Sequence, residues 1–328
     1  MNTVRDVCVI GLGLIGGSVL RAAVASGRKA WGASTSTSDT EAAAADGYDV
    51  VGGDDAVAEA LRRAAAADAV VVLAVPLTAV RSVLALVERH APGCLLTDVT
   101  SVKVPVREAV RAVAPSVTFV GGHPMAGTAE SGWQAAKDDL FSGAAWVTTV
   151  DDDTDLTAWR EVSALAVALG ARVVPLESET HDETVARVSH VGHLLAAVLA
   201  SVGAAGGPVA ASLAAGSFAD GTRVAGTRPA LVQAMTEGNR AALLPVVDEA
   251  LGALGAARGS LASTGGLAST IEAGHEALRR MTDQRNAPRT SVRVRLSAPD
   301  ARDALLSVGH RGGHVTGFDG DVALADVP

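Results

Sequence analysis

The sequence predicts an α/β protein with a doubly wound parallel sheet, followed by an all-helical domain and a short C-terminal appendage. In the first half, short apolar runs alternate with Ala-rich stretches of helical periodicity. The first apolar run ends in a Gly-rich turn. From about residue 180 to residue 285 only helical periodicity remains. We therefore expect three parts, over residues 1–178, 179–287 and 288–328.

The expected strands of the first part are short apolar runs, over 4–10, 30–34, 69–75, 94–98, 117–121, 145–150 and 172–176. Helical periodicity is found between them, over 14–26, 56–67, 78–90, 104–113 and 155–169. Strands that alternate with helices in this way form a parallel sheet that is covered on both faces. The acidic run 151–153 is expected to be a solvated turn.

The helical part is expected to begin at a capping box formed by Thr180 and Glu183. Within it, residues 194–216 carry no charge and are long enough to span a bilayer. Because this run consists mostly of Ala, Gly and Ser and is broken at 206–208, we expect two short buried helices and no membrane span. Residues 291–296 predict a strand and 300–308 a helix in the appendage.

The composition indicates a globular protein with a small-molecule partner. Hydrophobic residues make up 48% and charged residues 19%, and the net charge is −9 without any Lys/Arg-rich run, so nucleic acid is not an expected partner. Cys8 and Cys94 lie in apolar runs and are expected to be buried thiols. No metal-ligand spacing is present, and no secretory signal pattern, which favours a cytoplasmic location.

The strongest local motif is G-x-G-x-x-G at Gly11, Gly13 and Gly16, directly after an apolar strand and at the start of a helix. The first glycine allows a tight turn, the second leaves room for a pyrophosphate, and the third lets helix and strand pack closely. This context predicts a Rossmann-type domain that binds NAD or NADP. Ser34 stands where an NAD site usually has Asp or Glu, so the choice between the two cofactors stays open.

Polar side chains lie at the ends of two of the expected strands, at the edge of the sheet where ligands bind in open α/β folds. Asp98 and Ser101 follow one strand, and His123 lies on a Gly-rich loop after the next. In the helical part, Asp182 and His193 share one helix face, and Arg223 lies near the start of another helix. Each also has a structural interpretation, as a hydrogen-bonded core residue, a helix-dipole partner or a surface ion pair.

Five motifs in order carry a resemblance to a known family. They are GLGLIGGS at 11–18, DVTSVK at 98–103, GGHPMAG at 121–127, HDE with SHVGH at 181–193, and TRVA at 222–225. Together they resemble the prephenate/arogenate dehydrogenase family of tyrosine biosynthesis, over residues 4 to 285. The resemblance implies a nucleotide-binding domain followed by a helical domain that forms a homodimer.

The resemblance also implies roles for individual residues. His123 would accept the proton of the substrate's ring hydroxyl, and Ser101 would hydrogen-bond the same hydroxyl. Arg223 would hold a substrate carboxylate, with Asp182 as its candidate partner. His193 would line the side-chain end of the pocket, and His181 is expected to be structural.

The complete predicted site has no metal. Beside the residues above, Gly127 and Thr128 are assigned to the substrate, and Gly11, Gly13, Leu14, Ile15, Gly16, Ser34, Val75, Pro76 and Asp98 to the cofactor. Two departures from relatives, Ala129 in place of glutamate and Gly192 in place of proline, fall where the substrate's side chain would lie. Prephenate is therefore favoured over arogenate only by a small margin.

Two other functions remain as alternatives. A dehydrogenase of the same plan acting on a hydroxy acid or imine would normally use a catalytic lysine, and residues 180–285 contain none. A non-catalytic NAD(P)-binding regulatory dimer would not need His123, Ser101 and Arg223 together.

Overall fold

The computed structural model describes residues 4–128 and 130–328. Contacts divide the chain into two units. The first ends at His181 and includes Ser291–Val327, and the second is Asp182–Thr290. Most of the segment 288–328, which was expected to be a separate appendage, belongs to the first unit. The reason is that its three strands join a sheet with strands from residues 122–176.

The first sheet is fully parallel, in the order β3-β2-β1-β4-β5-β6. Its strands are β1 (Val7–Ile10), β2 (Ala30–Ala33), β3 (Val50–Val51), β4 (Val70–Leu73), β5 (Leu95–Asp98) and β6 (Thr118–Val120). This is the strand order of dinucleotide-binding Rossmann domains. The chain crosses over between β3 and β4, so the order reverses between β1 and β4, where such folds bind their ligands.

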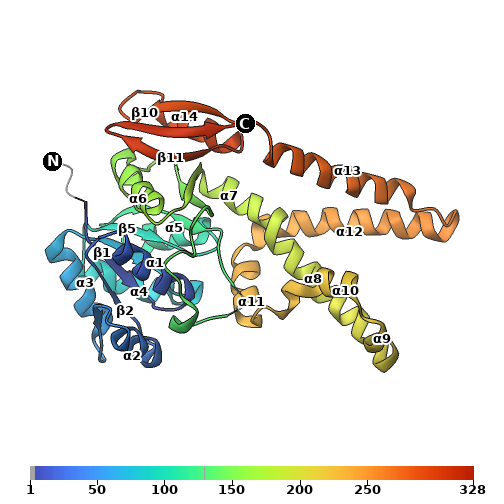
Figure 1. The fold of residues 1–328 in the computed structure, drawn as a ribbon, viewed down its shortest axis with the longest axis horizontal. Coiled ribbons are helices and arrows are strands. Elements are labelled where there is room, and N and C mark those ends of the chain that lie inside the picture. The colour runs from blue at the N-terminus through green and yellow to red at the C-terminus, as the bar shows by residue number, and fades with distance from the viewer. Residues whose placement is uncertain (1–3, 129) are drawn as a thin grey trace. The chain divides into compact units, whose positions relative to one another are not determined.

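Two cores lie on the two faces of this sheet, because successive strand residues point to opposite sides. Val7 and Val9 of β1 pack in one cluster with α1 (Leu14–Ala25). Cys8 and Ile10 pack in the other. That cluster includes residues of α3 (Ala56–Ala67), α4 (Leu77–His90) and α5 (Val104–Val113). Figure 1 shows these helices around the sheet, with α2 (Thr37–Ala45) beyond β2.

A second, mixed sheet has the order β10-β12-β11-β9-β8-β7. Its strands are β7 (Gly122–Pro124), β8 (Ala145–Thr149), β9 (Arg172–Leu176), β10 (Thr290–Arg295), β11 (His314–Asp319) and β12 (Val322–Val327). The short 3-10 helix η1 is Trp133–Ala135. The helices α6 (Leu156–Ala168) and α14 (Ala301–His310) pack on this sheet. The strand expected over 172–176 has those bounds, and the other strands and helices expected in this region are present with shifted ends. The strand β7 was not expected, and no ranges were predicted for β11 and β12.

The second unit is helical. It comprises η2 (Ala186–His190), a π-helical turn, α8 (Val191–Ala204), α9 (Gly207–Leu213), α10 (Gly216–Thr222), η3 (Arg223–Gly226), α11 (Pro229–Gly238), α12 (Arg240–Ser263) and α13 (Ala268–Arg285). Its first residues, from Asp182 on, form the second half of α7 (Ser178–Val185), whose first half belongs to the first unit. The capping-box prediction was wrong, because α7 begins at Ser178 and Thr180 lies inside its first turn.

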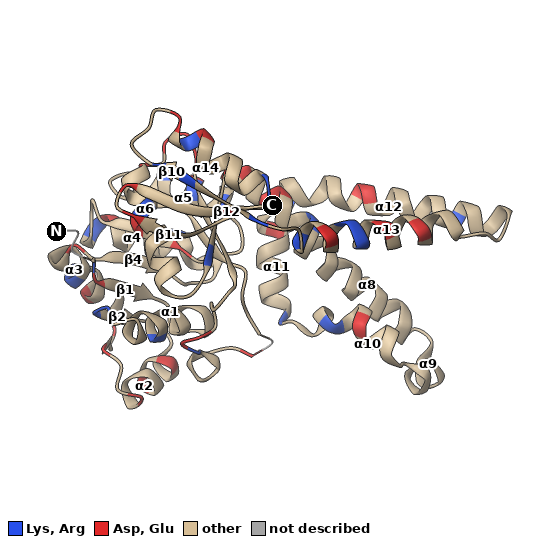
Figure 2. Ribbon diagram, turned by 45° about the horizontal axis from the view of Figure 1, so that its top comes forward, with Lys and Arg blue, Asp and Glu red and all other residues tan. Residues whose placement is uncertain are grey.

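The helical unit has a small core of its own, with a buried cluster of only Ala186, Leu243 and Val246 among the described residues. The two short helices expected near 194–216 are present, but they are not buried, since Ala196 is the one buried residue in α8 and none is buried in α9. In Figure 2 the ribbon of this stretch is tan throughout, because it contains no Lys, Arg, Asp or Glu. The run Ser178–Ala204 is long and apolar enough to cross a membrane by length and composition alone, and 22% of its most apolar 18-residue stretch is buried.

Candidate active site

The glycine loop after β1 has the geometry that its sequence predicts. Gly11 has a φ of +104°, and a Cβ there would lie 2.4 Å from the carbonyl oxygen of Ala74. A Cβ on Gly16 would lie 1.9 Å from the carbonyl oxygen of Gly11. By contrast, a Cβ on Gly13 would meet no atom within 4 Å. The first and third glycines are therefore needed by the fold, whereas the second faces open space.

This open space adjoins the start of α1. No side chain of the described residues caps α1, whose N-cap is Gly13. The N-terminus of a helix presents unpaired N–H groups and a partial positive charge, which together bind phosphate groups. The loop therefore fits a dinucleotide pyrophosphate, with Leu14 and Ile15 in the first turn.

The other predicted cofactor residues follow neighbouring strands. Val75 and Pro76 follow β4 after one residue, Ala74, and β4 is the neighbour of β1, the strand that leads into the glycine loop. Ser34 follows β2, and its hydroxyl accepts a hydrogen bond from the Ser36 amide at 3.1 Å.

The carboxylate of Asp98 has a different environment from the one predicted. It is fully buried, and its Oδ2 accepts hydrogen bonds from the amide and hydroxyl of Thr100 and from the ammonium of Lys103. Its Oδ1 accepts from the Gly122 amide at 3.0 Å. Within the described residues, this carboxylate thus organises the protein itself, and its predicted contact with the cofactor stays a prediction.

Lys103 completes a buried clamp on the peptide that precedes His123. The Lys103 side chain is 1% exposed, and its Nζ donates to the Gly122 carbonyl at 2.6 Å. The amide and the carbonyl of Gly122 are therefore both held by the Asp98–Lys103 ion pair. A Cβ on Gly122 would lie 2.5 Å from the Asp98 carbonyl oxygen, so only glycine allows this approach.

His123 lies on a strand, not on the loop that its glycine-rich surroundings predict. It is the central residue of β7 and stands opposite Val147 of β8 in an antiparallel pair. Sites on strands are held more precisely than sites on loops. Ser101 lies in the segment after β5 that Lys103 ties to Gly122, so the two predicted catalytic residues lie on adjoining, connected segments. Gly127 and Thr128 follow β7 and are exposed.

A histidine that sequence reasoning treated as structural contacts His123 directly. His123 Nδ1 and His181 Nε2 lie 2.8 Å apart, and the two rings meet edge to face with centroids 5.0 Å apart. His181 is 1% exposed and lies in the first turn of α7. Its position directly before Asp182 in the HDE motif was the available signal.

In the helical unit, the predicted residues surround the π-helical turn. Asp182 and His190 are buried, and the amide nitrogen of Asn239 lies 2.7 Å from the Asp182 carbonyl oxygen and 3.0 Å from His190 Nδ1. His193 Nδ1 is buried without a hydrogen-bond partner in the described residues. Such an atom costs about 1–3 kcal/mol when left unsatisfied, so His193 is suited to bind a ligand.

Arg223 is exposed and begins η3, which packs against the helix α8 that carries His193. Its side chain forms no ion pair or hydrogen bond with any described residue, so the predicted pairing with Asp182 is not seen. An unpaired guanidinium remains available for a carboxylate of a ligand.

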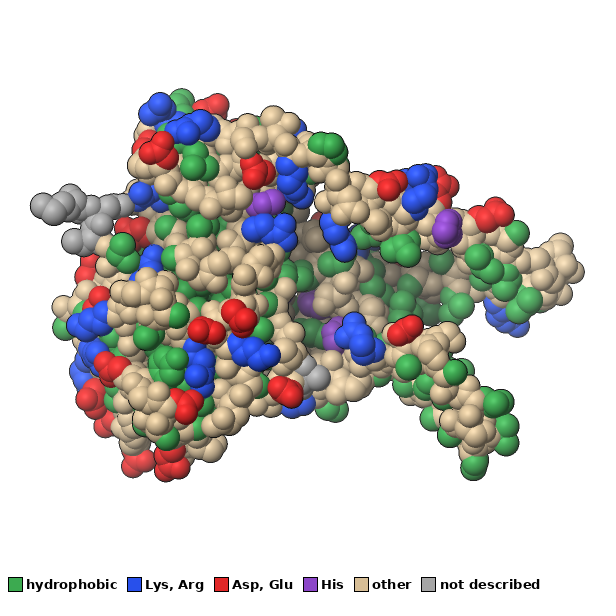
Figure 3. Space-filling view, viewed as in Figure 1, with side chains coloured by type: hydrophobic (Ala, Val, Ile, Leu, Met, Phe, Trp, Pro, Cys, Tyr) green, Lys and Arg blue, Asp and Glu red, His purple; other side chains and the backbone are tan. Residues whose placement is uncertain are grey.

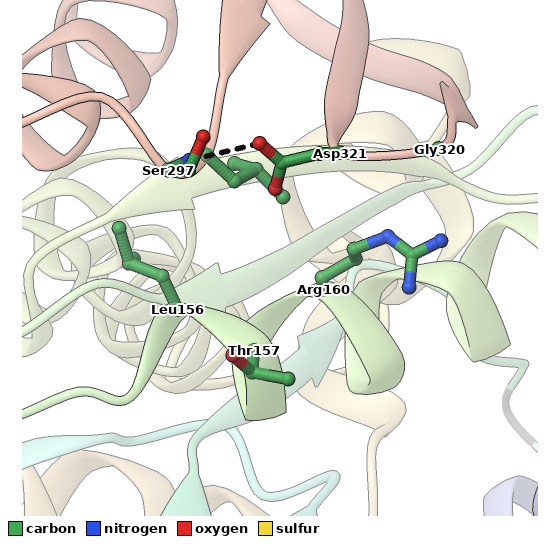
Figure 4. Close-up of a pocket in the computed structure, with 7 residues that line it drawn as sticks. Leu156, Thr157, Arg160, Ser297, Gly320 and Asp321 are labelled. Atoms are coloured by element: carbon green, nitrogen blue, oxygen red, sulfur yellow. Dashed lines mark hydrogen bonds between the residues drawn. The ribbon is translucent and has the colours of Figure 1, made fainter. Parts of the chain in front are cut away.

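A surface cavity of about 480 Å³ lies apart from all these residues. Figure 4 shows it between α6 and the C-terminal strands, lined by Leu156, Thr157, Arg160, Leu296, Ser297, Gly320 and Asp321. None of the predicted site residues lines it. Among the described residues, no group of three or more His, Cys, Asp or Glu side chains is placed to hold a metal ion.

Comparison with known proteins decides the family. Residues 23–175 match the model of the prephenate dehydrogenase nucleotide-binding domain, and residues 177–264 match that of the prephenate dehydrogenase dimerization domain. The chain belongs to the prephenate dehydrogenase family. It is an oxidoreductase that binds a nicotinamide dinucleotide in its first unit.

Relatives cover most of the chain. A crystal structure of a Corynebacterium glutamicum protein, provisionally described as a prephenate dehydrogenase, is 42% identical, covers 94% of this chain and 98% of its own, and has a TM-score of 0.88. The Bacillus subtilis prephenate dehydrogenase is 34% identical over 76% of this chain and 68% of its own length. The Zymomonas mobilis cyclohexadienyl dehydrogenase is 31% identical over 81% of this chain and 92% of its own.

Proposed function

We propose that this enzyme oxidatively decarboxylates prephenate to 4-hydroxyphenylpyruvate, with NAD or NADP as hydride acceptor, in tyrosine biosynthesis. The observation that carries the proposal is the placement of His123. It lies on a strand next to the carboxyl edge of a dinucleotide-binding sheet, with the preceding peptide clamped and one ring nitrogen hydrogen-bonded.

The proposed reaction needs one base for the hydroxyl proton and one hydride acceptor for the electrons. A bound nicotinamide would supply the hydride acceptor for the ring carbon that bears the substrate's hydroxyl. His123 accepts the hydroxyl proton, because histidine is the side chain whose ordinary imidazole can take up and release a proton near neutral pH. The ring carboxyl leaves as carbon dioxide, and its bonding electrons make the ring an aromatic phenolate. The protonated His123 returns its proton to the phenolate oxygen, so the product is the phenol and the base is restored. Ser101 orients the hydroxyl by a hydrogen bond.

Substrate recognition is assigned to the helical unit. Arg223 holds a carboxylate of the substrate by a fork of donors, which its unpaired side chain supports. His193 Nδ1 binds the side-chain end of the substrate, which would satisfy a buried nitrogen that has no partner in the described chain. Asp182, a buried carboxylate of the same unit, is proposed to take part in substrate binding.

Prephenate is favoured over arogenate, which differs in carrying an amino acid in place of the keto acid. The departure at Ala129 lies outside the described residues. At Gly192, a Cβ would meet nothing within 4 Å, so the missing proline is not explained by crowding. Ser34 can serve a ribose hydroxyl or a 2′-phosphate, so both cofactors are proposed.

The enzyme is proposed to act as a cytoplasmic homodimer through its helical unit, without a membrane or nucleic-acid partner. Of the large apolar side chains that the structure leaves exposed, all but Val4, Val24 and Met125 lie in Val188–Met281. Figure 3 shows these side chains along the helices of this unit. Exposed apolar surface of this extent marks a protein interface, and the matching family model is described as a dimerization domain.

A crossed assay tests the proposal. Purified enzyme is supplied with prephenate or arogenate, each with NAD or NADP, and reduced nicotinamide is followed at 340 nm together with released carbon dioxide. We expect turnover with prephenate, and we expect one carbon dioxide to be released for each cofactor molecule reduced. Turnover with arogenate alone would replace the proposed substrate, and no turnover with either would support the non-catalytic alternative.

A further inference from the structure

The contact between His123 and His181 constrains the protons on both rings. Two ring nitrogens 2.8 Å apart form a hydrogen bond only if one carries a proton and the other presents a lone pair. If His181 donated, a neutral His123 would carry its proton on Nε2 and could not accept another there. If His123 Nδ1 donates, its Nε2 presents the lone pair that a base needs.

We propose that His181 is a positioning residue for His123. It accepts a hydrogen bond from His123 Nδ1, and so fixes both the orientation of the ring and the tautomer in which Nε2 is the basic nitrogen. This inference rests on the proposed function, because it assigns the proton acceptor within the same site. In serine hydrolases a buried carboxylate holds the catalytic histidine in the same way, and here a neutral imidazole does so.

His181 is itself held firmly in place. It lies in the first turn of α7, where the Ser178 amide and hydroxyl donate to the two carboxylate oxygens of Asp151, at 2.9 and 2.7 Å. Arg107 of α5 pairs with the same carboxylate at 2.9 Å. The His181 amide donates to the Glu177 carbonyl at 2.9 Å. The start of this helix is thus tied to the nucleotide-binding domain that carries His123.

The contact also suits the charge that develops during the reaction. When His123 Nε2 takes up the substrate's proton, the ring becomes an imidazolium and its Nδ1–H becomes a stronger donor. A neutral His181 accepts that stronger hydrogen bond without moving. The positioning residue therefore supports the protonated base as well as orienting the neutral one.

Kinetics of matched variants separate this role from a structural one. His181→Gln offers an acceptor oxygen near the place of Nε2, whereas His181→Leu offers none. We expect His181→Leu to lower kcat about 10- to 100-fold, with KM for prephenate within threefold and cofactor affinity unchanged, and His181→Gln to stay within threefold of the wild type. His314→Leu, which removes a buried histidine of β11, is the control for loss of stability. Equal losses in both His181 variants, or an unchanged kcat in His181→Leu, would overturn the proposal.

A direct measurement does not depend on the folding of any His181 variant. Long-range ¹⁵N NMR of histidine-labelled enzyme reports which ring nitrogen carries the proton, and the His123 signals are those lost in His123→Asn. Protonated Nδ1 and bare Nε2 on a neutral His123 are expected, and the opposite tautomer would refute the inference. If His123→Asn keeps the full rate of the wild type, His123 is not the proton acceptor, and the proposed function is rejected independently of the results for the His181 variants.

Discussion

Substitutions in the glycine loop after β1 should separate effects on folding from effects on cofactor binding. A methyl group at position 16 would lie 1.9 Å from the Gly11 carbonyl oxygen and 2.7 Å from the Ala74 Cβ. Backbone must move to accept it, so Gly16→Ala is expected to cost about 3 kcal/mol of unfolding free energy. For a unit of this size that lowers Tm by roughly 6–12 °C.

Gly13→Ala should behave in the opposite way. Its φ of −70° suits alanine, and the added methyl meets no protein atom within 4 Å. We expect Tm within about 2 °C of the wild type, because the lower entropy of the unfolded chain offsets the weaker N-cap. The methyl group instead occupies the approach of the pyrophosphate, so Kd for NAD or NADP should rise at least about tenfold, or 1.4 kcal/mol.

Thermal unfolding and calorimetric titration of both variants with each cofactor provide the test. The reasoning is refuted if Gly13→Ala binds both cofactors as tightly as the wild type does. It is equally refuted if Gly16→Ala unfolds at the wild-type temperature, because a contact of 1.9 Å with backbone cannot be relieved by a side-chain rotation.

Three further predictions concern other parts of the molecule. Arg223→Ala should weaken prephenate binding by about 2–4 kcal/mol, which raises KM roughly 30- to 1,000-fold. Arg228 is also exposed, and Arg228→Ala serves as the control. An unchanged KM in Arg223→Ala would reject the carboxylate contact. Val202 lies on α8 with 67% of its side chain exposed, so Val202→Asp should shift the enzyme toward monomer in sedimentation velocity, whereas Val24→Asp on α1 should not. A Val202→Asp dimer as stable as the wild-type dimer would exclude this part of α8 from the interface. Burial raises the pKa of Cys8 and of Cys94 to about 12, so both thiols stay protonated at pH 8. They should therefore resist alkylation by iodoacetamide until the protein is unfolded. Rapid labelling of the folded enzyme would contradict their burial.

The first half of the fold could be predicted because its signals are local. Each strand of the parallel sheet is a buried apolar run, and helices such as Ala56–Ala67 show their apolar face at period 3.6. The helix α2 was missed because its TSDTEAAAA sequence has no apolar stripe, and its start depends on the Ser36 hydroxyl accepting from the Asp39 amide.

Contacts between residues far apart in sequence could not be predicted. The acidic run 151–153 is expected from the sequence to be a solvated turn, yet the Asp151 carboxylate is buried against Arg107 and holds the start of α7. Likewise, Gly122 and His123 form a strand because β8 pairs with them, which no local pattern indicates. The contact of His123 with His181 joins residues 58 positions apart, so neither sequence motif alone could reveal it.

The central claim is that His123 takes up the substrate's hydroxyl proton as the ring is oxidised. The most direct test is the rate of cofactor reduction by His123→Asn with saturating prephenate, beside its affinity for the cofactor. We predict a kcat lower by roughly 10²–10⁴-fold and a cofactor Kd within twofold of the wild type. A wild-type kcat in this variant, with the protein folded and dimeric, would contradict the account.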